Sequence, residues 1–363
     1  MNLRKACLYI ESDSIGCNNY PFDDNPEGNG FKNLLYSFVY MKKAMKEMGF
    51  DISTKDINRP EDSEIVICWD NPHQLTCEKS EGKIWVLLIY DPPVYCPESW
   101  DPSYYSRFDF VFTFDETKVD NKKIFYYSFA IDTEYFSIPS VITKEEFNGR
   151  KLATIVSNAI QANPNKNYPD TTHYRRYDTI RWYGIHHQND FRFYSGSFLN
   201  RNHYFEVRGF GVLRKLVPSN LLNKITKRIQ RRLYRVFGGV LGPLEKFDVI
   251  KKYKFYYCYE NTVGINGYVS EKLFDCLYSG VVPIYWGAPN IKELIPFKCY
   301  IDGFSFKNQK DVYEFINSMT YEEYCKYLNE ARDFLNSEYM ERFTVKSSVE
   351  NILSVVSKGL QTS

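Results

Sequence analysis

The sequence alternates strand-length apolar runs with segments of helical periodicity, and this alternation limits the folds that the chain can adopt. Residues Glu64–Trp69 and Lys83–Tyr90 are nearly continuous apolar runs, which is typical of strands covered on both faces of a sheet. Residues Phe31–Met48 place apolar side chains at helical spacing and are followed by Gly49, a residue type that commonly ends a helix. The first half is therefore predicted to form a βαβ-type, largely parallel sheet. Its predicted strands are Ala6–Ile10, Glu64–Trp69, Lys83–Tyr90, Phe108–Phe114 and Ile124–Phe129.

A second series of strands and helices follows a stretch around residues 138–150 where the pattern lapses. At 363 residues, of which 44% are hydrophobic, the chain can form two domains with a core each. We predict an α/β protein with two Rossmann-like domains that face a central cleft. The predicted units are an N-terminal domain (1–145), a C-terminal domain (146–340) and a C-terminal helix (341–363). The second series comprises strands at Leu152–Ser157, Phe191–Tyr194, Lys254–Glu260 and Val281–Trp286, and helices near Arg176–Ile185, from Glu271, and at Asp311–Met319, Tyr321–Asn336 and Val345–Lys358.

Composition excludes several classes of protein. No stretch approaches the roughly 18 consecutive apolar residues that a membrane-spanning helix needs, and Glu11 and Asp13 interrupt the apolar run near the start, so no secretory signal is expected. The nine cysteines are scattered and lack metal-site spacing. We therefore expect reduced cysteines, no metal site and a cytoplasmic protein.

The richest concentration of chemically informative residues lies between positions 253 and 296. A predicted buried strand ends at Glu260 and Asn261, a glycine-containing loop follows, and a helix begins after a serine that makes a good N-cap. Free N–H groups and the positive end of the helix dipole suit a phosphate group. Lys272 adds a positive charge, and Glu271 can accept two ribose hydroxyls. The same two residues also fit an ordinary solvated first helical turn.

This stretch resembles the signature of the fucosyltransferases of glycosyltransferase family 10. The matching groups are Tyr253-Lys254-Phe255, Glu260-Asn261, Tyr268-Val269-Ser270-Glu271-Lys272 and Gly280-Val281-Val282-Pro283-Ile284-Tyr285-Trp286-Gly287. The resemblance implies a fold of the GT-B type, with the acceptor domain first and the GDP-sugar domain second. It also implies an inverting enzyme that transfers L-fucose from GDP-fucose to a glycan hydroxyl, as in α-1,3 linkage to GlcNAc of a surface polysaccharide or lipid-linked glycan. The donor-binding residues that it implies here are Glu260, Asn261, Tyr268, Glu271 and Lys272.

Weaker parts of the family pattern lie earlier in the chain. Residues 155–158 resemble the strand that opens the donor domain, and the helix that contains Arg176 resembles the family's arginine helix. In such enzymes the arginine holds the donor pyrophosphate, which suits its planar, bidentate fork. Arg176 is favoured over the adjacent Arg175 for this role. The alternative is a surface helix with two solvated arginines.

The catalytic base proposed for the family is a glutamate in a Glu-Ser-Pro turn after a strand of the first domain. Here the turn after Lys83–Tyr90 begins with Asp91 and two prolines, so the resemblance makes Asp91 the candidate base. Aspartate is one methylene shorter than glutamate, so the acceptor hydroxyl must come closer, because a base acts within hydrogen-bond reach. Glu98 is the fallback base. The alternative role of Asp91 is to form the turn before proline.

The sequence contains no Asp-x-Asp triplet, which metal-dependent nucleotide-sugar enzymes often use. We therefore expect no metal or other cofactor, with Arg176, Lys272 and helix N–H groups neutralising the diphosphate. Two alternatives remain open at this level. One is a GT-B transferase for a different GDP-deoxyhexose, and the other is a non-catalytic nucleotide-sugar or glycan-binding homologue.

A basic insert occupies residues 201–243. It carries ten Lys or Arg residues against the single acid Glu206, whereas the whole chain has a net charge of +1. Between positions 213 and 240 apolar side chains recur at helical intervals, with Pro218 at the expected start and Gly238-Gly239 at the expected end. Such a helix suits peripheral contact with an anionic membrane on its cytoplasmic face. Packing on its own domain is the alternative, and the aliphatic face argues against nucleic acid.

Overall fold

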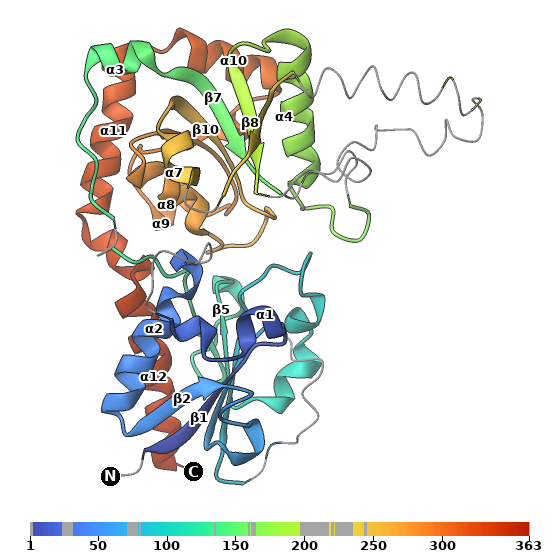
Figure 1. The fold of residues 1–363 in the computed structure, drawn as a ribbon, viewed down its shortest axis with the longest axis vertical. Coiled ribbons are helices and arrows are strands. Elements are labelled where there is room, and N and C mark those ends of the chain that lie inside the picture. Colours follow the sequence, from blue (N-terminus) through green and yellow to red (C-terminus); the bar gives the residue numbers. More distant parts are fainter. Residues whose placement is uncertain are drawn as a thin grey trace.

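The computed structural model describes residues 3–23, 32–70, 79, 81–133, 136–158, 160, 165–196, 218, 221, 235–242 and 245–362. They form two α/β domains, one above the other in Figure 1, each built on a six-stranded sheet in which all strand pairs are parallel. The parallel sheets predicted from the apolar runs are confirmed.

The first sheet has the strand order β2-β1-β3-β4-β5-β6. Its strands are β1 (Arg4–Tyr9), β2 (Phe50–Thr54), β3 (Ile65–Trp69), β4 (Ile84–Leu88), β5 (Phe110–Thr113) and β6 (Ile124–Tyr126). Its helices are α1 (Asp13–Gly16) and α2 (Lys32–Glu47), and short 3-10 turns are η1 (Tyr20–Phe22), η2 (Pro60–Asp62), η3 (Pro97–Trp100), η4 (Pro102–Arg107) and η5 (Glu116–Lys118). Every residue of β4 is buried, as its continuous apolar run predicts. Strand β2, which sequence analysis did not predict, is the edge strand beside β1.

The second sheet has the order β12-β11-β10-β7-β8-β9. Its strands are β7 (Lys151–Val156), β8 (Phe191–Ser195), β9 (Phe237–Val240), β10 (Tyr253–Tyr259), β11 (Val282–Trp286) and β12 (Ile301–Asp302). Its helices are α3 (Lys144–Gly149), α4 (His173–His186), α7 (Glu245–Ile250), α8 (Glu271–Tyr278), α9 (Ile291–Leu294), α10 (Gln309–Ser318) and α11 (Tyr321–Leu335), with 3-10 turns η6 (Gly303–Ser305) and η7 (Glu338–Phe343). Helix α4 begins three residues before the predicted start, so Arg176 lies in its first turn.

The predicted end of the basic helix is wrong. Residues 237–240 form strand β9, which pairs with β8, and Val236 just before it is completely buried. A Cβ added to Gly238 would lie 2.3 Å from the ring of Tyr194, so this glycine permits close strand contact rather than ending a helix. Most of the predicted basic amphipathic segment, 213–240, lies outside the described residues.

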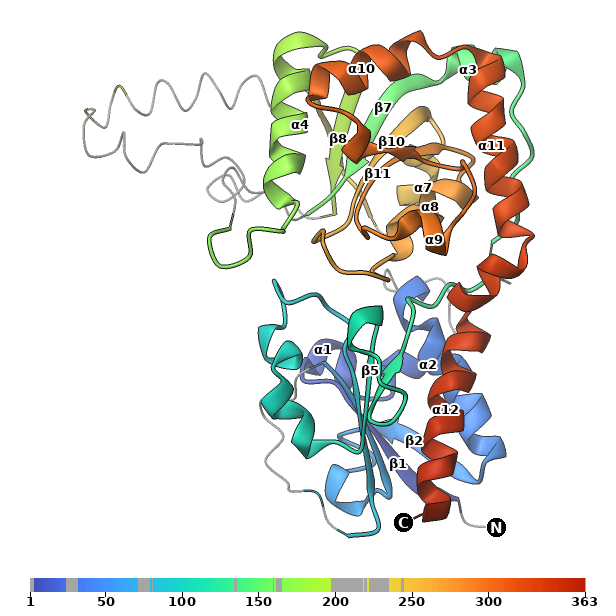
Figure 2. The ribbon, with the colours of Figure 1, turned by 180° about the vertical axis from the view of Figure 1, so that it is seen from behind.

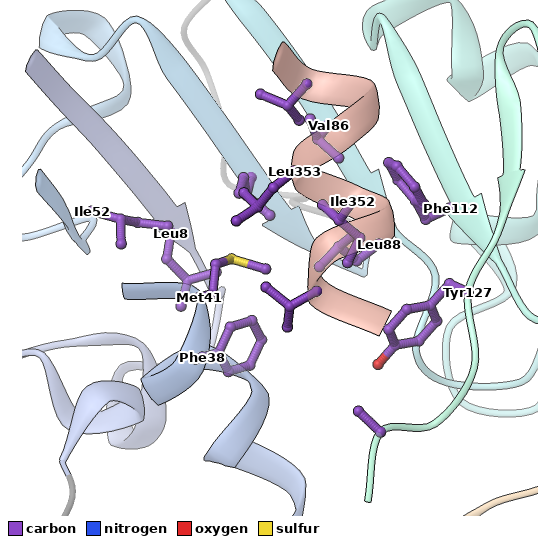
Figure 3. Packing of buried hydrophobic residues seen from close by; sticks show 14 of the residues in the cluster. Leu8, Phe38, Met41, Ile52, Val86, Leu88, Phe112, Tyr127, Ile352 and Leu353 are labelled. Atoms are coloured by element: carbon purple, nitrogen blue, oxygen red, sulfur yellow. The ribbon is translucent and has the colours of Figure 1, made fainter. Parts of the chain in front are cut away.

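The last helix, α12 (Val345–Thr362), returns to the first domain, where Figure 2 shows it running along one face. Where the chain crosses, the N–H of Ile131 donates to Phe343 and the N–H of Val345 donates to Ile131. The helix then packs beside α2 and against β4 and β5 (Figure 3), in a core that contains Leu8, Phe38, Met41, Ile52, Val86, Leu88, Phe112, Tyr127, Ile352 and Leu353. The core of the first domain is therefore completed by the last residues of the chain.

A second link between the domains centres on Glu116, which follows β5. Its carboxylate accepts one hydrogen bond from Asn290 of the second domain and one from Arg342 of the crossing segment, each at 2.6 Å. Asn290 in turn accepts the N–H of Gly267 at 2.9 Å. Gly267 has φ +86°, and a Cβ there would lie 2.1 Å from the carbonyl oxygen of Phe114. The loop before α8 thus lies directly against the first domain.

Both sheets direct the carboxyl ends of their strands toward the domain boundary (Figure 1). In the second sheet the chain moves from β7 to β8 in one direction and from β10 to β11 in the other. The ends of β7 and β10 therefore flank the point where the strand order reverses, and open α/β sheets bind ligands at such points.

We expect Ile352→Ala to destabilise the first domain by about 2–5 kcal/mol, because it removes a large apolar side chain from a packed core. Ile352 is 1% exposed, although it lies only a few residues from the end of the chain. Ser354→Ala, at an exposed position of the same helix, is the control and should change stability by less than about 0.5 kcal/mol. Urea unfolding measures both, and equal effects would contradict the described packing of α12.

Candidate active site

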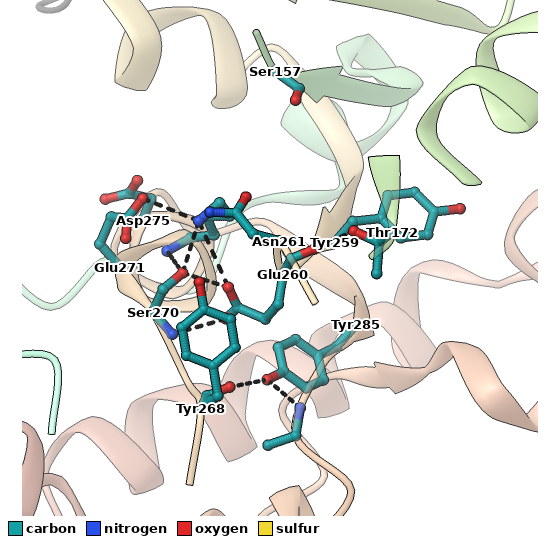
Figure 4. A network of polar contacts seen from close by, with 12 residues as sticks. Ser157, Thr172, Tyr259, Glu260, Asn261, Tyr268, Ser270, Glu271, Asp275 and Tyr285 are labelled. Atoms are coloured by element: carbon teal, nitrogen blue, oxygen red, sulfur yellow. Dashed lines mark hydrogen bonds and ion pairs between the residues drawn. The ribbon is translucent and has the colours of Figure 1, made fainter. Parts of the chain in front are cut away.

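The carboxylate of Glu260 organises the polar network at the end of β10 (Figure 4). Glu260 is completely buried, and its two oxygens accept hydrogen bonds from the N–H of Ser270 at 2.8 Å and from the Ser270 hydroxyl at 2.5 Å. The ammonium group of Lys272 lies 3.6 Å away. Burial raises the pKa of Glu260, while Lys272 and Ser270 oppose that rise. Because Glu260 is not exposed, its contacts support the start of α8. The resemblance had implied a direct contact between Glu260 and the donor.

Glu271 and Lys272 are the partly exposed charged residues at the start of α8, with 22% and 21% of their side chains exposed. The two groups lie 3.4 Å apart, and Lys272 also donates to the Ser270 hydroxyl at 3.0 Å. Burial lowers the pKa of Lys272, but Glu271 and Glu260 raise it to a net value above the ordinary one. Burial raises the pKa of Glu271, but Lys272 and Lys246 bring it below the ordinary value. Both side chains are therefore charged near neutral pH.

Lys246 is a charged residue of this site that sequence analysis missed. It lies on α7 and forms an ion pair with Asp275 of α8. Burial lowers the pKa of Lys246, but Asp275 and Glu271 raise it well above the ordinary value. No motif marked this lysine, because its partner lies 29 positions away in the sequence.

Arg176 joins the ends of β7 and β10 from the first turn of α4. Its guanidinium donates to the Ser157 hydroxyl at 2.9 Å, the Asn261 side chain at 3.0 Å, and the carbonyl oxygens of Tyr259 and Glu260 at 3.0 and 3.1 Å. The residue is only 2% exposed, and burial lowers its pKa. The structure thus places a buried positive charge at the strand-order reversal.

Arg175 takes a different position from its neighbour. Its guanidinium lies over the ring of Tyr174, at 5.5 Å from the ring centre, and it lines a separate cavity of about 200 Å³ beside Tyr259, Trp286 and Asn308. Of the two arginines that the sequence left open, Arg176 is the one bound to Asn261 and the end of β10.

Asp91 approaches this network from the first domain. It directly follows Tyr90 at the end of the β4 region and is partly buried. Burial raises its pKa, while the charge of Lys272 lowers it and that of Glu271 raises it further. Asp91 therefore lies within electrostatic reach of the start of α8. Glu98, by contrast, lies on η3 and is exposed to solvent.

Tyr268 is 1% exposed and packs into the first domain rather than lying open at the site. Its ring centre is 4.6 Å from that of Phe114 and 5.6 Å from that of Phe129. Burial raises the pKa of its phenol, with further contributions from Glu260, Glu271 and Asp91. Tyr268 thus connects the loop before α8 to the opposite domain.

His173, the first residue of α4, makes a contact across the domain boundary that sequence analysis did not predict. Its Nε2 lies 3.0 Å from the hydroxyl of Tyr95 in the first domain. Burial, Arg176 and Lys272 together lower the pKa of His173 to about 3. The imidazole that contacts Tyr95 is therefore neutral near neutral pH.

The structure has two α/β domains, each with a parallel sheet, and the carboxyl ends of both sets of strands face the domain boundary. This is the GT-B type of fold. Residues 219–351 match the family model described as glycosyltransferase family 10 (fucosyltransferase) C-terminal. This part of the chain is therefore similar to the C-terminal domain of the family 10 fucosyltransferases. The match agrees with the family that the sequence motifs suggested.

Three similar proteins illustrate the relationship. An α-(1,3)-fucosyltransferase of Helicobacter pylori is 38% identical over 71 residues, which cover 20% of this chain and 15% of the relative. A GDP-fucose protein O-fucosyltransferase 3 of Danio rerio is 44% identical over 50 residues, covering 14% of this chain and 11% of the relative. A crystal structure of an α1,3-fucosyltransferase shares the fold, with a TM-score of 0.51 and 17% identity over 99% of this chain and 90% of that one. The matches to the curated relatives thus span less than a fifth of their length.

The lowered pKa of His173 predicts a pH dependence of stability. The unfolded chain binds a proton at this histidine below about pH 6.5, whereas the folded protein does so only near pH 3. Stability should therefore fall as the pH drops from 6.5 toward 3, by about 1.4 kcal/mol per pH unit from this residue. His173→Gln should flatten that slope.

Urea unfolding of both proteins at pH 7, 6 and 5 measures the effect. Ile185→Ala, at a position of the same helix that is 41% exposed, is the control and should keep the wild-type slope. An unchanged slope in His173→Gln would show that the histidine is not held neutral.

Proposed function

We propose that the protein transfers L-fucose from GDP-fucose to a hydroxyl of a glycan acceptor, with inversion at the anomeric carbon. The observation that carries the proposal is the pair Glu271 and Lys272 at the start of α8, which acts electrostatically on Asp91 of the opposite domain. The match of residues 219–351 to the family model and a relative whose name includes GDP-fucose support the choice of donor.

In this proposal the donor binds at the carboxyl edge of the second sheet. The start of α8 offers the positive end of a helix dipole, and Lys272 adds a full charge for the diphosphate. Glu271 accepts hydrogen bonds from the ribose hydroxyls, and Asn261 lies beside Arg176 next to the same edge. Arg176 contributes its charge from below the surface and fixes the two strand ends. The diphosphate needs no metal ion here, because these cations neutralise it.

The chemical step follows from the placement of Asp91. Its carboxylate takes the proton of the acceptor hydroxyl while that oxygen bonds to the anomeric carbon and the bond to the GDP oxygen breaks. Lys272 and Arg176 stabilise the negative charge that develops on the leaving diphosphate. Burial raises the pKa of Asp91, which strengthens it as a base.

The acceptor and the location of the enzyme also belong to this proposal. We propose an α-1,3 linkage to GlcNAc of a surface polysaccharide or lipid-linked glycan, made in the cytoplasm. The basic segment 213–240, largely outside the described residues, would hold the enzyme at an anionic membrane surface through its eight cations and its aliphatic positions. Among the described residues, no helix has the length and apolar character to span a membrane.

Calorimetric titration in the presence of EDTA tests the donor site. GDP and GDP-fucose should bind, and Lys272→Ala should weaken GDP binding about tenfold to a hundredfold, because it removes a charge-assisted contact to phosphate. Lys310→Ala, a lysine whose side chain is 70% exposed on α10, is the control and should bind like the wild type. Preferred binding of GDP-mannose or of a UDP-sugar, or binding only when a metal is restored, would contradict the corresponding part of the proposal.

Asp91→Asn should lower kcat by about a hundredfold to ten-thousandfold, because the amide cannot accept the acceptor proton. GDP affinity should stay at the wild-type value. Steady-state kinetics compare it with Glu98→Gln, which changes an exposed carboxylate a few residues away and should leave kcat unchanged. If Glu98→Gln is the inactive variant, the base has been misassigned; if neither is, the site works without a carboxylate base.

A further inference from the structure

A second carboxyl group, that of Asp70, is buried beside Asp91 and has no part in the proposed function. Asp70 directly follows β3 and is 7% exposed. Its Oδ1 accepts the N–H of Tyr90 at 2.8 Å, and both oxygens lie 3.2 Å from the N–H of Asp91. The side chain of Trp69 hydrogen-bonds to the same carboxyl group. The carboxyl oxygens of Asp70 and Asp91 lie within 4.8 Å of each other.

These bonds fix the main chain at the point where it leaves the sheet. Strand β4 ends at Leu88, so the N–H groups of Tyr90 and Asp91 lie beyond its ladder. The next two residues are prolines, which have no N–H group to offer. Asp70 itself has φ +55° and donates its own N–H to Leu88 at 2.8 Å. The left-handed backbone conformation of Asp70 thus accompanies the contact between its carboxyl group and the main chain that follows β4.

The surroundings of Asp70 agree with a supporting role. Burial and the neighbouring Asp91 raise the pKa of Asp70 well above its ordinary value, while the N–H groups of Tyr90 and Asp91 oppose that rise. The carboxyl group can accept these main-chain hydrogen bonds with or without a proton, because a protonated carboxyl group keeps its carbonyl oxygen.

We propose that Asp70 is a positioning residue that holds the main chain of Tyr90 and Asp91 so that the Asp91 carboxylate faces the acceptor hydroxyl. The inference rests on the proposed role of Asp91 as the base. An asparagine has the shape of a protonated aspartate, accepts an N–H through its amide oxygen and tolerates a positive φ. Glycine tolerates the same φ but has no oxygen to accept these bonds. Comparing Asp70→Asn with Asp70→Gly therefore distinguishes the effect of losing these hydrogen bonds from the effect of changing the backbone conformation.

Steady-state kinetics test the inference, with kcat expressed per GDP-binding site so that unfolded protein does not count. Asp70→Gly should lower kcat about tenfold to a hundredfold, because a small displacement of the base slows the reaction that much. Its donor KM and GDP affinity should stay within about twofold of wild type, because the donor site lies on the other domain. Asp70→Asn should recover most of kcat.

Asp109→Ala provides the matched control. Asp109 accepts the N–H of Trp85 at 2.8 Å, which is the same kind of bond at the opposite end of the same strand. Its removal should leave kcat unchanged. If Asp70→Gly does not fold, Asp70→Ser replaces it, since a hydroxyl can accept only part of this set of bonds.

An unchanged kcat in Asp70→Gly, or an Asp70→Asn variant as slow as Asp70→Gly, would overturn the positioning role. If that happens while Asp91→Asn is inactive, the proposed function stands without Asp70. If Asp91→Asn is itself fully active, the assignment of the base fails, and the inference about Asp70 fails with it.

Discussion

The site depends on one buried carboxylate, that of Glu260. It accepts both polar hydrogens of Ser270 and faces the ammonium group of Lys272, while its own main-chain carbonyl accepts a hydrogen bond from Arg176. Removing one partner of a buried ion pair usually costs about 3–5 kcal/mol, because the other charge is left without compensation. Glu260 occupies the position where one residue contacts both the first turn of α8 and the arginine that binds the end of β10.

The chemistry that we propose needs groups from two domains, and the fold supplies the links that hold them together. Helix α12 carries the end of the chain into the core of the first domain. Glu116 of that domain binds Asn290 and Arg342, and Asn290 holds the loop that leads to α8. Tyr268 packs its ring against Phe114 from the opposite side of the boundary. The proposed base and the helix proposed to bind the donor are thus held at a common boundary by several independent contacts.

Local patterns in the sequence predict those parts of the fold that short segments determine. The continuous apolar runs of β4 and β10 and the serine N-cap of α8 lie where the sequence indicated, because strand burial and helix capping depend on adjacent residues. Strand β9 escaped prediction because its two glycines fit the end of a helix equally well. Contact with Tyr194 explains Gly238, and a φ of +131° explains Gly239.

The site was predictable to the extent that its residues lie in the family's motif. The motif selected Lys272 and Glu271, which the structure places partly exposed at the start of α8. It did not show that Glu260 and Tyr268 are buried. Lys246, His173 and Asp70 act through partners that are distant in the sequence or across the domain boundary. No local pattern distinguishes such residues from ordinary polar residues, because their contacts form only when folding brings distant segments of the chain together.

The most direct test of the account is an NMR measurement of the product formed from GDP-fucose and acceptors that end in N-acetylglucosamine. The account predicts one new glycosidic bond whose anomeric configuration is opposite to that of the donor, formed by the wild type in the presence of a chelator. A product that retains the donor's configuration would contradict a single displacement with Asp91 as the base. The absence of any transferred fucose, despite tight binding of GDP-fucose, would contradict the account as a whole.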